Sequence, residues 1–208
     1  MLNNYYIQKN LKALNYYKGK IDEIIGPKSI QAIKDFQKDF NLIISGIWNQ
    51  ETNDCMEQVI KECQVILHCR KIDGMWGNET ESKYQAMNGI KHFKLSEFKC
   101  HCGCGETRID IRLVKILDEI RDYYGKPLIV TSGVRCPKHN KEVGGSSKTS
   151  WHLSTRGGRA SDFYVQGVKV TELLSHCIDL RNQGKIRYTY TNNTSMNGVV
   201  HIDIGGIR

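Results

Sequence analysis

Two stretches decide the fold of the second half of the chain: "RASDFYV" at residues 159–165 and "GVVHIDIGG" at residues 198–206. Both are rich in β-branched and aromatic residues, which predicts two strands. Side chains alternate across a strand, so the later stretch places His201 and Asp203 on one face and aliphatic residues on the other. If the strands pair antiparallel with Asp162 opposite His201, the Cβ atoms of these two residues lie about 4.5–5.5 Å apart. An imidazole and a carboxylate would then reach the same metal ion.

A third ligand is predicted in the loop that precedes the first of these strands. His152 lies in "TSWHLSTRGG" at residues 149–158, a polar and glycine-rich stretch. Zinc binds histidine nitrogen and carboxylate oxygen at about 2.0–2.2 Å, and three protein ligands leave its fourth position for water, as in catalytic sites. Strand periodicity alone leaves it open whether all three side chains converge.

The rest of the second half is predicted to be helix and strand. "IDIRLVKILDEIRDYYG" at residues 109–125 has the apolar spacing of an amphipathic helix and ends at a glycine. "KPLIVTSGV" at 126–134 predicts a strand, and "VTELLSHCIDLRNQG" at 170–184 predicts a further helix. With the two strands above, this half is predicted to be an α+β domain with a small antiparallel sheet of three strands.

The first half contains an internal repeat. "KIDEIIGPKSIQA" at residues 20–32 aligns with "KIDGMWGNETESK" at 71–83, an offset of 51. Upstream, the apolar residues align at an offset of 52, which predicts that the second turn is one residue shorter; the aligned pairs are Ile7 with Val59, Leu11 with Cys63, and Leu14 with Ile66. Each unit therefore predicts a helix, a turn and a second helix. Together the units predict a small all-α domain over residues 1–88.

The second helix of the first unit, at residues 29–40, has an apolar stripe formed by Ile30, Ile33, Phe36 and Phe40. The run "LNYYKGKIDEIIGPKSIQAIKDFQKDF" at 14–40 resembles the peptidoglycan-binding domain of many bacterial and phage wall hydrolases. Asn15 and Glu23 stand where that family usually has glycine. The resemblance covers about residues 3–87 and implies that this half tethers the protein to peptidoglycan. Any other small helical bundle is the alternative.

Four motifs in the second half share their order with one family: "VTSGVRCPKHNKEVGG" at 130–145, "SWH" at 150–152, "GRASD" at 158–162 and "VHIDIGG" at 200–206. They resemble the zinc-dependent D-Ala-D-Ala carboxypeptidases, a family that includes phage L-alanyl-D-glutamate endopeptidases and shares its metal core with the hedgehog domain. The resemblance spans about residues 93–208. It implies a catalytic domain over residues 89–208.

The resemblance also implies roles for individual residues. One catalytic zinc ion would be held by His152, Asp162 and His201. A planar, two-pronged arginine suits a substrate carboxylate. The implied substrate-binding residues are Ser132, Arg135 and Asn140, with Arg135 also acting in catalysis by orienting the scissile bond.

The chain departs from the family pattern in the loop between the first two ligands. Nine residues separate His152 from Asp162, where the family has six, so "STR" at 154–156 is interpreted as an insertion. A longer loop can still close on the ion, but His139 stays open as a rival ligand.

The general base is also open. Some relatives carry a catalytic histidine or acidic residue two or three positions before the last ligand, where this chain has Val199 and Gly198. Asp203 is the first candidate, and it could instead accept a hydrogen bond from a zinc ligand. His176 and His139 are the other candidates.

Three cysteines and a histidine lie within "KCHCGCG" at residues 99–105. The preferred interpretation is a tight turn at the entry to the catalytic domain, whose thiols pack locally or meet Cys136. An accessory structural metal, held by Cys100, Cys102 and Cys104, is the alternative.

Composition narrows the function classes. Residues 1–88 carry 11 Lys and Arg against 11 Asp and Glu, whereas residues 89–208 carry 19 against 11, so the net charge of +8 belongs to the second half. A positive field attracts polyanions, including an anionic wall polymer.

No window holds 18 uninterrupted apolar residues, and the start "MLNNYYIQKN" lacks a secretory signal, so neither membrane insertion nor export by that route is expected. The eight cysteines are then expected to be reduced or to bind metal.

These observations predict a monomeric zinc peptidase that hydrolyses an amide bond in peptidoglycan stem peptides, like an endolysin that stays in the cytoplasm until it is released to the wall. Its partner would be peptidoglycan. A catalytically inactive wall-binding zinc protein is one alternative. A zinc-containing nucleic-acid-binding protein is the other, and it fits poorly because the cysteine motif lacks finger spacing and aromatic residues are not interleaved with the charges.

Overall fold

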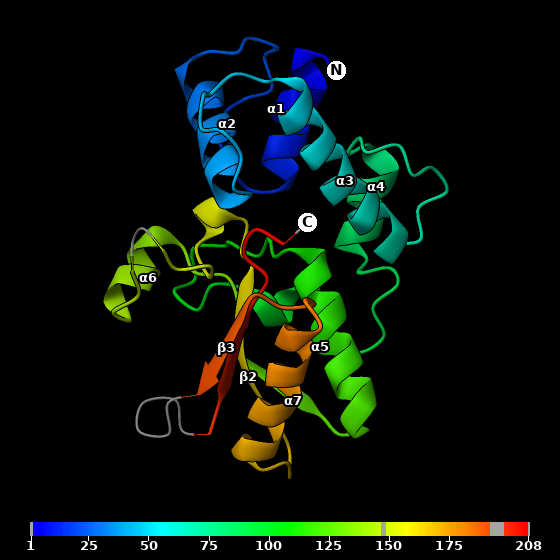
Figure 1. Ribbon diagram of the computed structural model, residues 1–208, viewed down its shortest axis with the longest axis vertical. Coiled ribbons are helices and arrows are strands. Elements are labelled where there is room, and N and C mark those ends of the chain that lie inside the picture. The colour runs from blue at the N-terminus through cyan, green and yellow to red at the C-terminus, as the bar shows by residue number, and fades with distance from the viewer. Residues whose placement is uncertain (1, 147–148, 192–197, 208) are drawn as a thin grey trace. The chain divides into compact units, whose positions relative to one another are not determined.

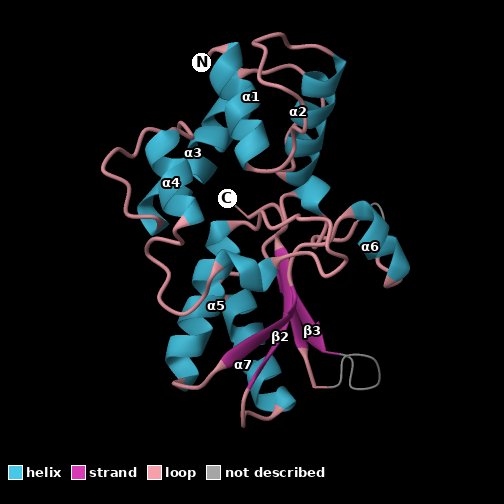
Figure 2. Cartoon of the chain, turned by 180° about the vertical axis from the view of Figure 1, so that it is seen from behind, coloured by secondary structure: helices cyan, strands magenta, loops and turns pink. Residues whose placement is uncertain are grey.

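The structure is a computed structural model that describes residues 2–146, 149–191 and 198–207. The chain divides into two compact units, Met1–Gly89 and Ile90–Ile207. The first unit is all helical and the second is α+β, which confirms the predicted fold class (Figures 1 and 2). Within the described part of the chain, no helix has the length and apolar character needed to cross a membrane.

The first unit consists of helices α1 (Asn4–Ala13), α2 (Pro27–Asp39), α3 (Gln50–Ile66) and α4 (Asn78–Gln85). Three members of the predicted stripe on α2 are buried, and these are Ile33, Phe36 and Phe40. The prediction for Ile30 is wrong, since this side chain is exposed. It lies about 100° around the helix from the buried Ser29, at the edge of the buried face, and approaches the turn at Gly46.

Three buried glutamines organise this unit: Gln8, Gln37 and Gln64. The Oε1 of each accepts a hydrogen bond from a backbone N–H of the turn that follows its helix, at 2.9–3.0 Å; the donors are Glu23, Gly46 and Gly74. The Nε2 of each donates to a carbonyl of the same turn, at 2.9–3.0 Å; the acceptors are Ile24, Ile47 and Met75. Each Nε2 also reaches a hydroxyl in the first turn of the next helix; these are Ser29, Thr52 and Thr80. Each glutamine thus supplies the partners that buried turn groups need.

The arrangement of a buried glutamine and the turn that it binds therefore occurs three times in the first unit. The predicted upstream alignment is wrong, because Gln8 corresponds to Gln64 at an offset of 56 and not 52. Apolar residues recur along any amphipathic helix, so several offsets satisfy a hydrophobic match equally well. The first turn is simply longer than the other two.

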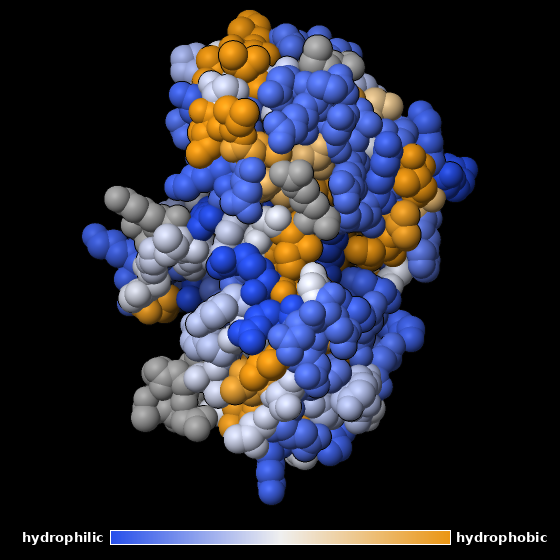
Figure 3. Space-filling model, viewed as in Figure 1, coloured by the Kyte–Doolittle hydropathy of each residue, from blue (hydrophilic) through white to orange (hydrophobic). Residues whose placement is uncertain are grey.

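The surface of the first unit carries exposed aliphatic side chains on the segments beside α2. They are Ile24, Ile43, Ile44 and Ile47. Figure 3 shows apolar patches on this unit among hydrophilic residues. Contiguous exposed apolar residues often mark a binding surface.

The second unit contains helices α5 (Ile111–Tyr124), α6 (Pro137–Glu142) and α7 (Val170–Asn182), with short 3₁₀ segments η1 (Leu95–Phe98) and η2 (Ser154–Arg156). Its sheet has the order β1-β2-β4-β3, and all three pairings are antiparallel. The strands are β1 (Leu128–Ser132), β2 (Ala160–Val165), β3 (Tyr188–Thr191) and β4 (Val200–Asp203). Helices α5 and α7 pack on the sheet (Figure 2). The prediction of three strands missed β3.

The two central strands pair in the register that was the condition for the predicted metal site. Asp162 of β2 lies directly opposite His201 of β4. The aliphatic face of β4 is buried as predicted, and its members are Val200, Ile202 and Ile204. Burial of this face prevents a one-residue slip, because a slip would turn the aliphatic side chains away from the core and the polar ones into it.

A buried ion pair joins the start of α5 to the start of β2. The Oδ2 of Asp110 accepts from Arg112 Nη2 at 2.8 Å and from Arg159 Nε at 3.2 Å, and Arg159 is fully buried. Burial alone would raise the pKa of Asp110, but the two guanidinium groups outweigh it and lower the pKa to about 2. A depressed folded-state pKa means that this contribution to stability is present above pH about 4 and is lost as the pH falls toward 2.

Replacing Asp110 with alanine removes the buried carboxylate that both Arg112 and Arg159 contact. We expect Asp110→Ala to lower the free energy of unfolding by about 3–5 kcal/mol, measured by urea denaturation. The control is Glu119→Ala, which removes a half-exposed pair with Lys185 at 3.8 Å and should cost less than about 1 kcal/mol. Equal costs for the two variants would show that the buried pair does not stabilise this unit.

Candidate active site

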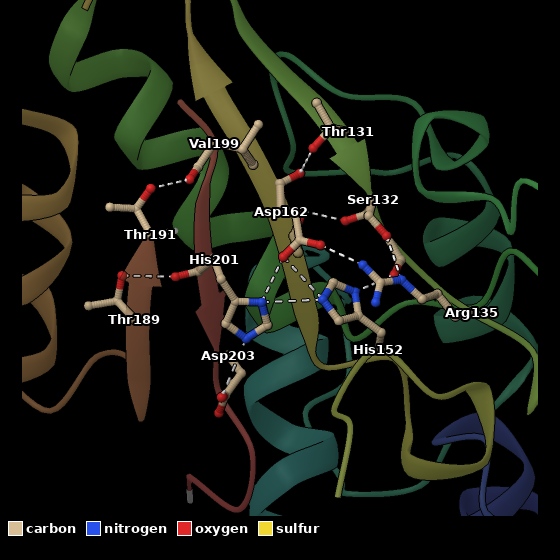
Figure 4. A network of polar contacts seen from close by, with 12 residues as sticks. Thr131, Ser132, Arg135, His152, Asp162, Thr189, Thr191, Val199, His201 and Asp203 are labelled. Atoms are coloured by element: carbon tan, nitrogen blue, oxygen red, sulfur yellow. Dashed lines mark hydrogen bonds and ion pairs between the residues drawn. The ribbon is translucent and has the colours of Figure 1, made fainter. Parts of the chain in front are cut away.

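Three buried polar side chains converge on one face of the sheet: His152, Asp162 and His201 (Figure 4). Their donor atoms all lie within 4.8 Å of one another. The Oδ1 of Asp162 is 3.2 Å from His152 Nε2 and 2.7 Å from His201 Nδ1, and the two nitrogens are 3.3 Å apart. The structure therefore brings together the three residues predicted as metal ligands.

The second nitrogen of each imidazole has a partner of its own. His152 Nδ1 lies 2.8 Å from the carbonyl oxygen of Gly133, which can only accept, so this nitrogen carries the proton. His201 Nε2 lies 3.7 Å from Asp203 Oδ2. These partners leave His152 Nε2 and His201 Nδ1 as lone-pair donors toward the centre, the arrangement usual for metal-ligating histidines. Two imidazole nitrogens and one carboxylate oxygen thus form a donor set that fits a divalent ion.

The contacts also set the protonation of the cluster. Burial lowers the pKa of His152 and favours its neutral form. Burial acts in the same direction on His201, but hydrogen bonds to Asp162 and Asp203 outweigh it and raise the pKa of this ring. Burial would raise the pKa of Asp162, yet hydrogen bonds with both histidines hold that pKa far below its usual range. A metal ion needs the neutral form of both histidines, so metal affinity falls as the pH is lowered.

The position of His152 is fixed by backbone pairing with the segment after β1. Arg135 donates its N–H to the His152 carbonyl at 2.8 Å, and Ser154 donates to the Arg135 carbonyl at 2.9 Å. The stretch interpreted as an insertion forms η2, which closes on itself because Gly158 donates to the Leu153 carbonyl at 3.1 Å. The extra residues are thus taken up in a compact turn, and His152 still reaches the cluster.

The indole of Trp151, next to His152, lies against Gly205 after β4. A Cβ at Gly205 would come within 2.0 Å of the Trp151 ring. The guanidinium of Arg156 lies 3.7 Å from the centre of the same ring. This close approach anchors the loop that carries His152 on the chain just after β4, the strand that carries His201.

Arg135 and Ser132 lie beside the cluster. Arg135 Nη2 donates to Asp162 Oδ2 at 2.5 Å, and its Nε donates to Ser132 Oγ at 2.8 Å (Figure 4). The register of β1 against β2 shifts between Val130 and Ser132, which accompanies the turn of the chain toward the site. Asp162 thus directs one oxygen to the cluster and the other to the arginine.

Three other predicted residues lie elsewhere. Asn140 is fully buried and donates to the Ser146 carbonyl at 3.0 Å, so it braces the loop after α6 and presents no amide to a substrate. The rival ligand His139 pairs with Glu142 at 3.7 Å. His176 stacks on Tyr123 between α7 and α5, with ring centres 4.2 Å apart. Neither histidine belongs to the cluster, which argues against both as ligand or general base.

Asp203 reaches the cluster only through His201. Its Oδ1 accepts from Arg187 Nε at 2.9 Å and from the Gly205 N–H at 3.1 Å, while its Oδ2 faces the far nitrogen of His201. Of the two predicted roles, this geometry favours the residue that orients a ligand over the general base. Face periodicity shows that Asp203 and His201 share a face but not which ring nitrogen the carboxylate meets, so the sequence leaves both roles open.

Sequence reasoning missed Tyr190. This residue lies opposite His201 in the pairing of β3 with β4, and the two ring centres are 4.8 Å apart. Burial, together with the charge of Asp162, raises the pKa of Tyr190, so its phenol stays protonated and can donate a hydrogen bond. The signal was "YTYT" at 188–191, whose aromatic and β-branched alternation is typical of a strand.

The second unit is thus an α+β domain whose His–Asp–His set can hold a divalent ion. Comparison with protein families agrees with this class. The model of the peptidase M15 family matches residues 91–203, more than half of the chain, so the chain belongs to this family and is a peptidase. A peptidoglycan binding domain matches residues 5–56. Both resemblances seen in the sequence are confirmed. A search of curated proteins found no match.

The role of Asp203 can be tested by Asp203→Asn, which keeps an acceptor for the Gly205 N–H but removes the negative charge beside His201. We expect the affinity of the cluster for a divalent metal ion, measured by competition with a chelator, to fall about 10–100-fold. Asp122→Asn, an exposed carboxylate of the same unit, is the matched control and should bind the ion normally. Unchanged affinity with lost hydrolysis would instead make Asp203 the general base.

Proposed function

We propose that this protein is a zinc peptidase that hydrolyses an amide bond in the stem peptides of peptidoglycan. The observation that carries the proposal is the convergence of His152 Nε2, Asp162 Oδ1 and His201 Nδ1 in a member of a peptidase family. The peptidoglycan binding domain in the same chain indicates the substrate.

Zinc is the proposed ion because the donor set suits it. Histidine nitrogen and carboxylate oxygen are its usual ligands, and three protein ligands are typical of catalytic sites. When bound, the ion would act as a Lewis acid, which polarises the scissile carbonyl and activates water. The protein's part is to direct one nitrogen of each imidazole toward the centre, and the contacts of the other nitrogens with Gly133 and Asp203 hold the rings in that orientation.

Arg135 is proposed to hold a carboxylate of the stem peptide. A guanidinium has five N–H donors, and the contacts with Asp162 and Ser132 use only part of them. Ser132 would act by orienting Arg135. Tyr190, whose ring lies beside His201, would donate a hydrogen bond to the substrate. Contacts on both sides of the scissile bond would use the binding energy of the peptide to orient that bond for hydrolysis.

The first unit is proposed to keep the peptidase at its substrate. A tether raises the effective concentration of a linked site without adding contacts to it. The exposed isoleucines beside α2 offer an apolar surface for this binding. The positive charge of residues 89–208 adds attraction to an anionic wall.

We also propose that the protein acts as a monomeric endolysin, which accumulates in the cytoplasm and reaches the wall on release. All eight cysteines are free, which suits a chain that folds in a reducing compartment. Two cleavage specificities fit the proposal, the D,D-carboxypeptidase type and the L-Ala-D-Glu endopeptidase type.

Digestion of purified sacculi tests the proposal. The full chain should release new amino and carboxyl ends, and mass spectrometry of the products identifies the bond. Asp162→Asn keeps the shape of the side chain but removes the charge that the ion needs, so we expect hydrolysis to fall at least about 100-fold. The same variant should still sediment with sacculi. His176→Gln, a histidine outside the cluster, is the control and should keep full activity.

Full hydrolysis by Asp162→Asn would show that the site is elsewhere. Zinc and sacculi bound by the unchanged chain, with no new ends released, would make it a catalytically inactive wall-binding protein. Salt-sensitive binding to DNA without binding to sacculi would support the nucleic-acid alternative.

A further inference from the structure

A second group of metal-type side chains lies apart from the His–Asp–His cluster. The sulfur atoms of Cys100, Cys102, Cys104 and Cys136 all lie within 4.8 Å of one another. The Cys102 sulfur is 3.5 Å from the sulfur of Cys100 and 3.5 Å from that of Cys136. Three of the thiols come from the turn after η1, and the fourth comes from the start of α6, more than thirty residues later in the chain.

The distances between the sulfurs suit one tetrahedral ion. Zinc binds thiolate sulfur at about 2.3 Å, so the sulfurs of a tetrahedral four-cysteine site lie about 3.8 Å apart. The observed 3.5 Å contacts are close to that edge and far from the length of about 2.05 Å that a disulfide requires. Four sulfurs within 4.8 Å of one another, with none in a disulfide, are therefore arranged as ligands are.

Backbone N–H groups point at these sulfurs. Cys136 donates its N–H to Cys100 Sγ at 3.4 Å, and His139 donates its N–H to Cys136 Sγ at 3.4 Å. The turn itself is closed because Cys100 donates to the Glu106 carbonyl at 2.8 Å. Hydrogen bonds to thiolates orient ligands and offset part of their negative charge.

Local packing does not account for the arrangement. Cys102 and Cys104 are exposed, so their thiols gain little from burial, while Cys100 is buried. A hydrophobic role would bury the sulfurs and would not need the fourth cysteine from a distant segment.

We infer that Cys100, Cys102, Cys104 and Cys136 hold a second divalent ion, zinc, in a structural tetrathiolate site. Four protein ligands leave no open position, so this ion would take no part in hydrolysis. It would tie the entry turn to the residue that follows Arg135. The segment carrying Arg135 also receives support from η1, because Val134 donates to the Phe98 carbonyl at 2.9 Å. The site thereby holds the arginine of the active site in place.

Metal counting in two complementary variants tests this inference. In the double variant His152→Ala/His201→Ala, which lacks the first cluster, one zinc per chain should remain. The double variant Cys102→Ser/Cys104→Ser changes only exposed side chains, and it should lose the zinc ion of the four-cysteine site. Cobalt substitution of the histidine variant should give the intense thiolate-to-cobalt absorption of a sulfur-ligated ion. Cys69→Ser in the first unit is the control and should change neither count nor spectrum.

Thiol labelling of the unchanged chain gives a second test, which does not depend on whether the cysteine variant folds. Under native conditions the four thiols should resist a water-soluble disulfide reagent until a strong chelator is added, and then all four should react. Immediate reaction of Cys102 and Cys104 without chelator, or a mass that shows disulfides, would overturn the inference. So would a histidine variant that binds no zinc. Because that variant lacks the catalytic set, this result is separate from failure of the proposed peptidase function.

Discussion

The active site depends on one buried carboxylate, that of Asp162. Its Oδ1 contacts both histidines of the cluster and its Oδ2 contacts Arg135, so a single side chain links the proposed metal ligands to the arginine proposed to hold the substrate. A buried carboxylate is stable only with such partners. The pairing of β2 with β4 supplies one of them, since it sets Asp162 opposite His201.

The other partners arrive through loops that the sheet alone does not place. His152 depends on backbone pairing with Arg135, on the closed turn η2 and on the contact of Trp151 with Gly205. Arg135 lies one residue before Cys136 of the proposed second metal site. The second unit is small, and its described residues form one four-stranded sheet and three main helices. Its loops therefore rely on polar contacts where a larger core would hold them by packing.

The sheet part of the site could be predicted because strand periodicity is a local property. Alternation showed which residues share a face of each strand, and the aliphatic residues of β4 excluded a one-residue slip. The pairing of Asp162 with His201 itself was a condition that the structure meets. The contribution of His152 came from family resemblance, because its position depends on contacts between distant segments. Burial of Asn140 and the nitrogen that faces Asp203 could not be predicted, since both depend on side-chain packing. In the first unit, the turns bound by the three buried glutamines were missed because an alignment of apolar residues does not include a polar residue in the core.

Anomalous diffraction at the zinc absorption edge, from crystals of the unchanged chain, tests the central claim most directly. The account predicts a peak at about 2.0–2.2 Å from His152 Nε2, Asp162 Oδ1 and His201 Nδ1. A zinc-loaded crystal without a peak between these three atoms would contradict it.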